Sequence, residues 1–180
     1  MLFKIPWPRS SNKGDPFWDF FVHHAPADPG NLVAEAIRTA PEGNIYPTRT
    51  EVHSPDITAS HLKELARFWQ ADEVGIVRLT DGDLPYAMVF GFYTDYDPKT
   101  APGIGGQHTV LKGAYVAFEM GAYIREMGYQ ATRTGEAGVE RLAATAGLKA
   151  PPGKHLYLTD ILQTDLPLAP DGVAAWQPTS

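Results

Sequence analysis

The predicted fold is organised around one stretch of the sequence, His108-Thr-Val-Leu-Lys-Gly-Ala-Tyr-Val-Ala-Phe-Glu-Met-Gly-Ala-Tyr-Ile-Arg-Glu-Met-Gly-Tyr129. Apolar and small residues recur along it at the three- and four-residue spacing of one buried helix face. Gly128 is a typical helix stop, and residues 129–134 then predict an extended segment that returns to a sheet. The sequence therefore predicts a central core helix whose small side chains let another backbone or a flat ligand approach closely.

A glycine-rich run directly precedes this helix and is the first candidate site. Glycines give the backbone freedom, and the amino-terminal end of a helix carries a positive partial charge. A flexible loop at a helix start suits the binding of polar groups on a ligand. The residues expected to contact the ligand here are Gly103, Gly105, Gly106, Gln107, His108 and Thr109.

The composition limits the classes of function. Of 180 residues, 43% are hydrophobic and 20% are charged, as in a single globular domain. The net charge of −6 gives no basic field, so we expect no nucleic-acid partner. The chain has no cysteine, which excludes disulfides and Cys-ligated iron–sulfur clusters within it. Apolar runs are too short to span a bilayer and no signal peptide is recognisable, so we expect a cytoplasmic protein without membrane insertion.

Residues 1–47 are rich in aromatic residues and proline, and they predict an arm that docks on the main domain, residues 48–180, or on a second subunit. One helix is expected within the arm, opening at Asp28-Pro29. Large rings left in water would form an apolar patch that soluble monomers avoid, which favours a homodimer formed through the arm. The adjacent pair His23-His24 does not share a helix face, and we expect no metal site there.

Helical and strand patterns follow one another in the main domain. Apolar residues at helical spacing predict helices, and short runs of apolar and β-branched residues predict strands. A long loop, 93–106, separates two of these elements, and such loops are more often functional than decorative. The expected elements are helix 56–70, strands 73–80 and 86–92, the central helix, strand 129–134, helix 136–148 and strand 155–163. The fold class is therefore α+β.

Four blocks of the sequence resemble a known family. The blocks are Ser60–Leu79, Gly121–Ala131, Leu142–Leu148 and Thr164–Leu168. In this order they resemble the cobalamin-binding domain of reductive dehalogenases and, more loosely, epoxyqueuosine reductases. The resemblance implies a nitroreductase-like α/β sandwich, with a central mixed or antiparallel sheet flanked by helices, that holds cobalamin or a related corrinoid. In full-length enzymes of this type, a ferredoxin-like module supplies electrons.

The chain departs from this family in two respects. It lacks the cysteine motifs of the ferredoxin-like module, so electrons would have to come from a separate donor protein. Between Leu148 and Gly153 it has only Lys-Ala-Pro-Pro, where family members usually carry a longer loop. The resemblance thus implies either a corrinoid carrier or binding module, or the corrinoid-bearing part of a reductase. Whether the chain is itself an enzyme stays open.

The resemblance also implies further site residues. In such dehalogenases a tyrosine near a basic residue is thought to give a proton to the substrate carbon. Lys99 and Lys112 are the basic residues nearby in the sequence, within and just after the loop 93–106. The candidates for that tyrosine are Tyr86, Tyr93 and Tyr96. A corrinoid needs an apolar slot with hydrogen-bonding groups at its rim. The additional residues expected to contact it are Tyr115, Thr159, Thr164 and Asp165, although Asp165 equally suits a turn or helix cap.

Two other classes of function stay open. The same general fold holds FMN in nitroreductases, and a cluster of cations near the first helix of the main domain would then bind the phosphate. Those cations would be Arg49, His61, Lys63 and Arg67. Alternatively, the small residues of the central helix only let helices pack in a ligand-free interaction domain. Phosphate-loop, nucleophile-elbow and zinc-helix motifs are absent from the sequence.

Overall fold

The computed structural model of the protein describes residues 14–24 and 30–172. Its elements are α1 (Pro16–His23), α2 (Gly30–Arg38), α3 (Pro55–Phe68), β1 (Glu73–Arg78), β2 (Tyr86–Thr94), α4 (Ile104–Glu126), β3 (Ala131–Arg133), α5 (Val139–Thr145), β4 (His155–Leu158) and β5 (Leu162–Thr164). Every helix and strand expected in the main domain has a counterpart in the structure, with end points that differ by a few residues, and the last expected strand is divided into β4 and β5. The structure confirms the α+β class.

The strands form one antiparallel sheet in the order β1-β2-β5-β3, with β4 also pairing β2. Of the mixed and antiparallel alternatives, the sheet is therefore the antiparallel one. Strand β2 lies at its centre and is buried on both faces along most of its length, as its nearly continuous apolar sequence predicts. This strand pairs with β1 on one side and with both β4 and β5 on the other.

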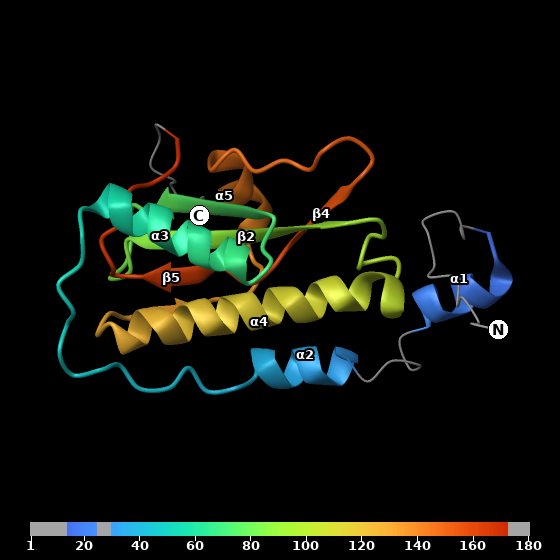
Figure 1. Ribbon diagram of the computed structural model, residues 1–180, viewed down its shortest axis with the longest axis horizontal. Coiled ribbons are helices and arrows are strands. Elements are labelled where there is room, and N and C mark those ends of the chain that lie inside the picture. Colours follow the sequence, from blue (N-terminus) through green and yellow to red (C-terminus); the bar gives the residue numbers. More distant parts are fainter. Residues whose placement is uncertain (1–13, 25–29, 173–180) are drawn as a thin grey trace, which may run out of the picture.

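Helices cover both faces of the sheet (Figure 1). Helices α3 and α4 cover one face, where Leu62, Phe90 and Met120 belong to the larger core cluster. Helix α5 covers the other face through a smaller cluster that includes Val89 and Leu142. Figure 1 also shows α2 alongside α4, on the side away from the sheet. The outer surface of α2 and α4 is therefore the part of this layer that no strand covers.

Both helices of the arm pack on α4. Helix α2 confirms the helix expected within the arm, although Asp28 and Pro29 lie outside the described residues. Helix α1 was not predicted. The Asp15 carboxylate accepts a hydrogen bond from the Phe17 N–H at 3.0 Å and Pro16 occupies the first turn, so the usual start signals of a helix were present. The dense aromatic run after them obscured the helical spacing.

The central helix begins earlier than predicted. Helix α4 starts at Ile104 with Gly103 as its N-cap, so most of the run expected to be a loop is helical. The prediction of a loop over residues 103–109 is therefore wrong. Glycine lowers helix propensity, but tertiary packing on both sides of this turn outweighs that local preference. The carboxyl end agrees with prediction, because Gly128 has a φ of +83°.

The last expected strand, 155–163, is interrupted by a bulge, so the prediction of one continuous strand is wrong. Strand β2 advances three residues over 88–91, while its partner advances four over 158–162. One extra residue is therefore inserted between β4 and β5, and such an insertion changes the direction of the side chains around it. Asp160 lies within this insertion and its carboxylate faces helix α2.

Candidate functional site

The glycines at the start of α4 are packed against the protein's own backbone. A Cβ atom on Gly103 would lie 2.3 Å from the Phe21 carbonyl oxygen, and one on Gly106 would lie 2.5 Å from Pro98 Cα. A Cβ on Gly105 would lie 2.7 Å from a methyl group of Val22. These glycines therefore allow α1 and the preceding turn to approach α4 closely. Contact between them and a ligand stays a prediction that this packing disfavours.

Several other predicted cofactor residues are buried within the fold. Gln107, Thr109 and Thr164 are all buried, and the Thr164 hydroxyl donates to the Gln130 carbonyl oxygen at 2.6 Å. Asp165 accepts a hydrogen bond from the Gln130 N–H at 2.7 Å and pairs with Arg49. These contacts hold β5 to the segment before β3, which accounts for Thr164 and Asp165 without a ligand.

Thr159 is a different case, because its buried hydroxyl has no hydrogen-bond partner among the described residues. A Cβ on Gly113 of α4 would lie 2.9 Å from this hydroxyl oxygen and 3.0 Å from the Tyr157 ring. The small residue at position 113 thus lets strand β4 lie directly against the helix. The prediction that another part of the chain or a ligand closely approaches the α4 face that carries small residues is correct at Gly113. There the approaching segment is the protein's own strand β4.

The three candidate tyrosines do not converge. Tyr86 lies at the start of β2 beneath the Arg78 guanidinium, 5.9 Å from its ring centroid, and Tyr93 lies near the other end of the strand. The Tyr93 hydroxyl donates to Glu73, and this hydrogen bond raises the pKa of Tyr93 to about 12. The Tyr96 hydroxyl accepts a hydrogen bond from the Trp18 ring N–H at 3.1 Å. Each phenol thus has a separate partner.

Two predicted cofactor residues remain accessible and lie together. His108 and Tyr115 line a hollow of about 290 Å³ on the outside of α4, with Ile37, Leu111 and Lys112. Tyr115 is 43% exposed, so its ring can contact a ligand without rearrangement of the core. The hollow combines aliphatic walls with an imidazole, an ammonium and a phenol at its rim.

A second hollow of about 360 Å³ adjoins the first at Ile37, which lines both. Its other lining residues are Leu32, Val33, Ala36, Ala40 and Phe118. Leu32 is 75% exposed and its neighbour Val33 is 49% exposed, so large apolar side chains gather on this face. We call the lining of the two hollows the outer apolar surface. An apolar surface of this kind commonly marks a binding site.

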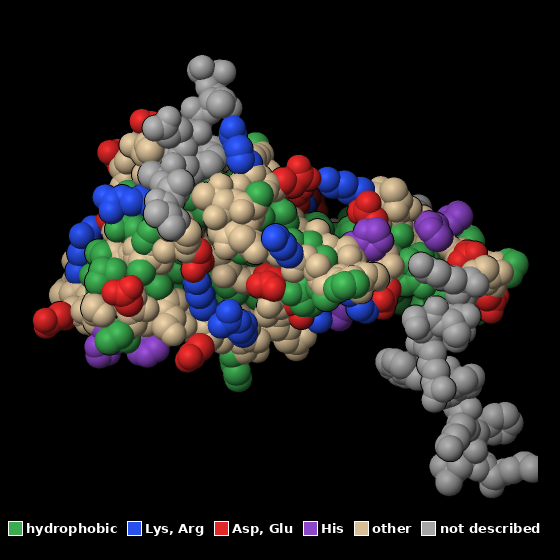
Figure 2. Space-filling model, turned by 90° about the horizontal axis from the view of Figure 1, so that it is seen from above, with side chains coloured by type: hydrophobic (Ala, Val, Ile, Leu, Met, Phe, Trp, Pro, Cys, Tyr) green, Lys and Arg blue, Asp and Glu red, His purple; other side chains and the backbone are tan. Residues whose placement is uncertain are grey.

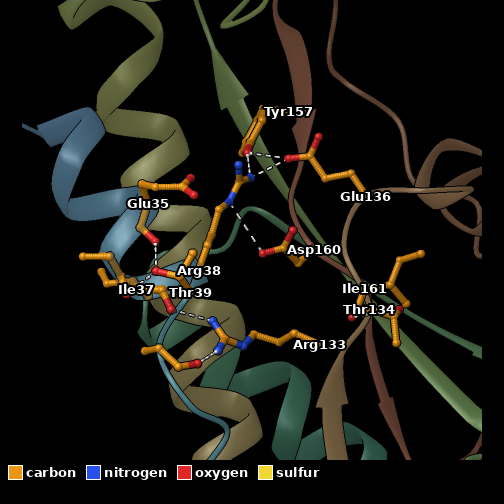
Figure 3. Close-up of polar contacts among 12 residues, drawn as sticks. Glu35, Ile37, Arg38, Thr39, Arg133, Thr134, Glu136, Tyr157, Asp160 and Ile161 are labelled. Carbon is orange, nitrogen blue, oxygen red and sulfur yellow. Dashed lines mark hydrogen bonds and ion pairs between the residues drawn. The ribbon is translucent and has the colours of Figure 1, made fainter.

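A polar cluster that was not predicted lies between α2 and β4. Arg38 donates from Nη2 to the Tyr157 hydroxyl at 2.7 Å, and that hydroxyl donates to Glu136 Oε1 at 3.2 Å (Figure 3). Arg38 also pairs with Glu136 and lies 3.6 Å from the Asp160 carboxylate, measured from Nε. Arg133, lower in the same view, donates to the Ile37 and Ala40 carbonyl oxygens. Together, the two arginines fix the carboxyl end of α2 to the sheet.

Burial sets the direction of the pKa shifts of the two acidic groups, Tyr157 and Asp160. It raises the pKa of the Tyr157 phenol above its ordinary value, and the nearby Arg38 charge only partly opposes that shift. Burial likewise raises the pKa of the Asp160 carboxyl, again against the influence of Arg38. A phenol shifted upward holds its proton more firmly than a free one, so Tyr157 is a hydrogen-bonding group and is not tuned as a general acid.

Sequence reasoning missed this cluster because its members are far apart in the chain. Arg38 and Tyr157 are 119 positions apart, and no local pattern connects them. Alternation along the last strand places Tyr157 and Thr159 on one face, which was the available signal for two of the side chains that approach α4. The bulge that turns Asp160 toward Arg38 is not indicated by any comparable pattern in the sequence.

The cations proposed for an FMN phosphate are mostly engaged elsewhere. Arg49 pairs with Asp165, and Lys63 pairs with Asp171. The His61 ring packs edge-on against His53, with centroids 5.7 Å apart. These contacts are spread over α3 and its flanking segments and form no phosphate cradle among the described residues.

The remaining surface carries charges of both signs. Figure 2 shows acidic and basic side chains interspersed on the face seen from above, without a broad region of lysine and arginine. Within residues 14–24 and 30–172, no helix is both long and apolar enough to cross a membrane.

Several solved structures of reductive dehalogenases share this fold. The N-terminally tagged catabolic reductive dehalogenase NpRdhA matches 82% of this chain, with a TM-score of 0.66 and 23% identity. The same enzyme in complex with 3-bromo-4-hydroxybenzoic acid matches 81%, with a TM-score of 0.65 and 25% identity. A reductive dehalogenase structure described as suggesting a mechanism for B12-dependent dehalogenation matches 82%, with a TM-score of 0.65 and 24% identity. The chain therefore forms a reductive dehalogenase-like domain.

The match covers only part of those enzymes. This chain spans about a quarter of their length, namely 25%, 24% and 25% of the three chains. No protein-family model matches the sequence, and neither does any curated protein.

Proposed function

We propose that this chain is a corrinoid-binding module that acts together with a second polypeptide. The observation that carries the proposal is the shared fold over four-fifths of the chain with reductive dehalogenases, one of them described as B12-dependent. The sequence blocks that resemble the cobalamin-binding domain of this family support the same assignment. When bound, a corrinoid supplies a cobalt centre suited to reductive chemistry.

The outer apolar surface suits one face of a flat macrocycle. Aliphatic side chains of α2 and α4 form its floor, and His108, Lys112 and Tyr115 stand at one side as hydrogen-bonding groups. A corrinoid carries amide groups at its rim, and these need such partners. The two hollows, about 360 and 290 Å³, are at the lower end of the size of small-molecule sites. This surface would therefore hold one side of the ligand and leave the other for a second polypeptide.

A binding or carrier role agrees better with the side chains than an autonomous reductase. Among the tyrosines, the pKa values of Tyr93 and Tyr157 are both raised, so neither phenol is activated as a proton donor. The chain also has no cysteine to ligate an iron–sulfur cluster. We therefore propose that a separate protein donates electrons where reduction occurs. The dimer through residues 1–47 likewise remains a proposal.

Titration of the purified chain with cobalamin tests the proposal. We expect binding with an absorbance shift toward the base-off form. Val33→Asp, which places a charge on the outer apolar surface, should weaken binding by about tenfold or more. Phe68→Asp on α3 is the control, because Phe68 is 80% exposed against 49% for Val33 and lies outside the outer apolar surface, so this variant should leave binding unchanged.

Three outcomes would contradict this assignment. An unchanged spectrum together with no retention of cobalamin on a sizing column would remove the corrinoid. A yellow, fluorescent protein that retains FMN would favour the flavin alternative. Equal losses in the Val33 and Phe68 variants would place the ligand elsewhere on the chain.

A further inference from the structure

Helix α3 presents a row of four exposed side chains to solvent. Ile57 is 47% exposed and Phe68 is 80% exposed, although both are large and apolar. His61 and Glu64 lie between them on the same face of the helix, and both are also exposed. We call Ile57, His61, Glu64 and Phe68 the α3 row. Exposed apolar side chains grouped in this way commonly mark a binding surface.

A hollow of about 420 Å³ lies beside the α3 row, between α3 and α4. Its lining residues are His61, Leu62, Glu64, Leu65, Phe68 and Tyr123. Tyr123 comes from α4 and is 44% exposed, so it extends the surface beyond α3. Neither the Glu64 carboxylate nor the His61 imidazole has a hydrogen-bond partner within residues 14–24 and 30–172. The surface therefore offers an incoming helix room, apolar contact and two unused polar groups.

The spacing of the α3 row is symmetric about its midpoint, which lies between residues 62 and 63. Its members follow one another at intervals of four, three and four residues, the spacing of the a and d positions that form one seam along a helix. A second α3 packed antiparallel about a two-fold axis at this midpoint would bring Ile57 against the partner's Phe68. The same arrangement would bring His61 against the partner's Glu64. The row is therefore complementary to itself, as an interface with two-fold symmetry requires.

The chemistry of the row also favours a second copy as its occupant. An imidazole carries an N–H donor in either protonation state, and a carboxylate accepts hydrogen bonds, so each His61 suits the partner's Glu64. These two polar pairs would lie at the centre of the seam, with an apolar pair beyond each of them. Polar groups at such positions fix the register of paired helices. A second copy supplies this order by symmetry, whereas an unlike helix would match it only by coincidence.

We propose that α3 is a self-association surface through which two copies of this chain form a dimer, with their α3 helices antiparallel. This inference goes beyond corrinoid binding and does not depend on it, because the outer apolar surface lies on α2 and α4. The interface is also distinct from residues 1–47, whose helices α1 and α2 pack on α4 of their own chain. One helix and its flank form a small interface, so we expect dissociation in the micromolar range.

Sedimentation equilibrium of the full chain, from about 1 to 500 µM, tests the proposal across the expected range of dissociation. We expect the mass to rise from that of one chain to that of two. Phe68→Asp should weaken self-association by about thirtyfold or more, because the two-fold axis places each new charge at two positions in the interface. Val33→Asp introduces the same charge on α2, outside the α3 row, and is the control that should dimerise normally.

A charge exchange tests the antiparallel register. His61→Glu should weaken self-association by about fivefold or more, because a carboxylate would then face the partner's Glu64. The double variant His61→Glu, Glu64→Lys should restore it, since each Glu at position 61 would face a lysine of the partner. Both positions are exposed, so the variants should fold like the parent, which circular dichroism checks.

Three results would overturn the proposal. The first is a parent chain that stays monomeric over the whole concentration range. The second is a dimer that Phe68→Asp leaves intact, which would assign self-association to another surface, such as residues 1–47. The third is a double variant that associates no better than His61→Glu alone, which would exclude the antiparallel pairing of the two α3 helices.

Discussion

Two regions of helix α4 show how differently similar expectations can turn out. At its amino-terminal turn, Gly103, Gly105 and Gly106 have neighbours so close that even a Cβ atom would collide with them. One to three turns further on, His108 and Tyr115 stand at the rim of a hollow, beside apolar side chains that nothing in the described chain covers. Both regions were expected to contact a ligand. Only the second leaves space for one.

The difference teaches that small residues and open space are separate properties. Glycine allows close approach, but the sequence does not say whether a ligand or the protein's own backbone makes that approach. A group of exposed large apolar residues indicates a binding surface more directly, because folding buries such side chains wherever packing allows. Substitutions in the two regions should therefore separate stability from binding.

The largest expected effect is a loss of stability when the amino-terminal turn of α4 is substituted. Gly106→Val would place new atoms against Pro98 Cα and the Ala101 carbonyl oxygen, both of which belong to backbone. We expect a loss of about 3 kcal/mol in the free energy of unfolding, measured by urea denaturation. Ile104→Ala, at an exposed position in the same turn, should change stability far less. A Gly106 variant as stable as the parent would contradict the close packing of this turn against the preceding backbone.

Arg38→Met should have the next largest effect, because Arg38 holds α2, and with it the outer apolar surface, against the sheet. The Asp160 side chain is only 10% exposed and would lose its nearest cation. Since α2 carries part of the binding surface, cobalamin affinity should fall as well. We expect a stability loss of about 2 kcal/mol near neutral pH, because a partly buried pair is broken from one side. Arg67→Met on α3 is a control for loss of one exposed surface charge.

The pH dependence of the Arg38 variant follows from Asp160. Burial raises the pKa of this carboxyl above its ordinary 3.8, so the folded state binds more protons than the unfolded chain as the carboxyl titrates. The contribution of Asp160 to stability therefore falls as pH rises above that value, and removing Arg38 should steepen the fall. Denaturation of both proteins near pH 3.8 and at about pH 7 should show the smaller difference at the lower pH. A constant difference would exclude Asp160 as the cause.

Tyr115→Ala should act on binding alone. Its ring is largely outside the core, so the free energy of unfolding should change by less than about 0.5 kcal/mol. Loss of one face of ligand contact should reduce cobalamin affinity by roughly five- to tenfold. Paired measurements of melting temperature and affinity sharpen the contrast with Gly106→Val. A variant that melts earlier but binds normally would move the ligand away from this hollow.

The smallest expected effect comes from Tyr93, which belongs to neither region. Its hydrogen bond to Glu73 raises the pKa of the phenol from 10.0 to about 12. The folded state keeps this proton where the unfolded chain loses it, so stability should decline slightly across that alkaline interval. Ultraviolet titration should show late phenolate transitions for Tyr93 and Tyr157, and Tyr93→Phe should remove one of them. A normal transition in the parent would mean that the hydrogen bond does not persist in solution.

Much of the fold could be predicted because its signals are local. The α4 spacing, the buried run of β2 and the Gly128 stop each depend on residues within a few positions of one another. The split between β4 and β5 could not be read from the chain, because a bulge is defined by the register against a partner strand. Helix α1 lay between these cases, since its Asp15-Pro16 start was recognisable but its aromatic sequence hid the spacing.

The candidate site was less predictable for the same reason. His108 and Tyr115 were named from their position on the helix, yet Ile37, which lines the same hollow, comes from α2, more than seventy positions earlier in the sequence. Arg38 and Tyr157 are separated further still. Thr164 and Asp165 were expected at the cofactor because of the family resemblance, and their contacts with Gln130 explain them structurally. Long-range packing decides which polar residues remain free.

Asp171, the partner of Lys63, also bonds through its carboxylate and its N–H to the Ile76 backbone at the outer edge of β1, and this has a consequence for biosynthesis. Ile76 leaves the ribosome 95 residues before Asp171 does. At a synthesis rate of roughly 5–20 residues per second, the outer edge of β1 waits roughly 5–20 seconds for its partner. During that interval a nascent chain presents an uncovered apolar strand edge to its neighbours on the same messenger. Glu73 and Arg78 bound the strand with charges of the kind that discourage pairing between chains, which offers a reason for their position at its two ends.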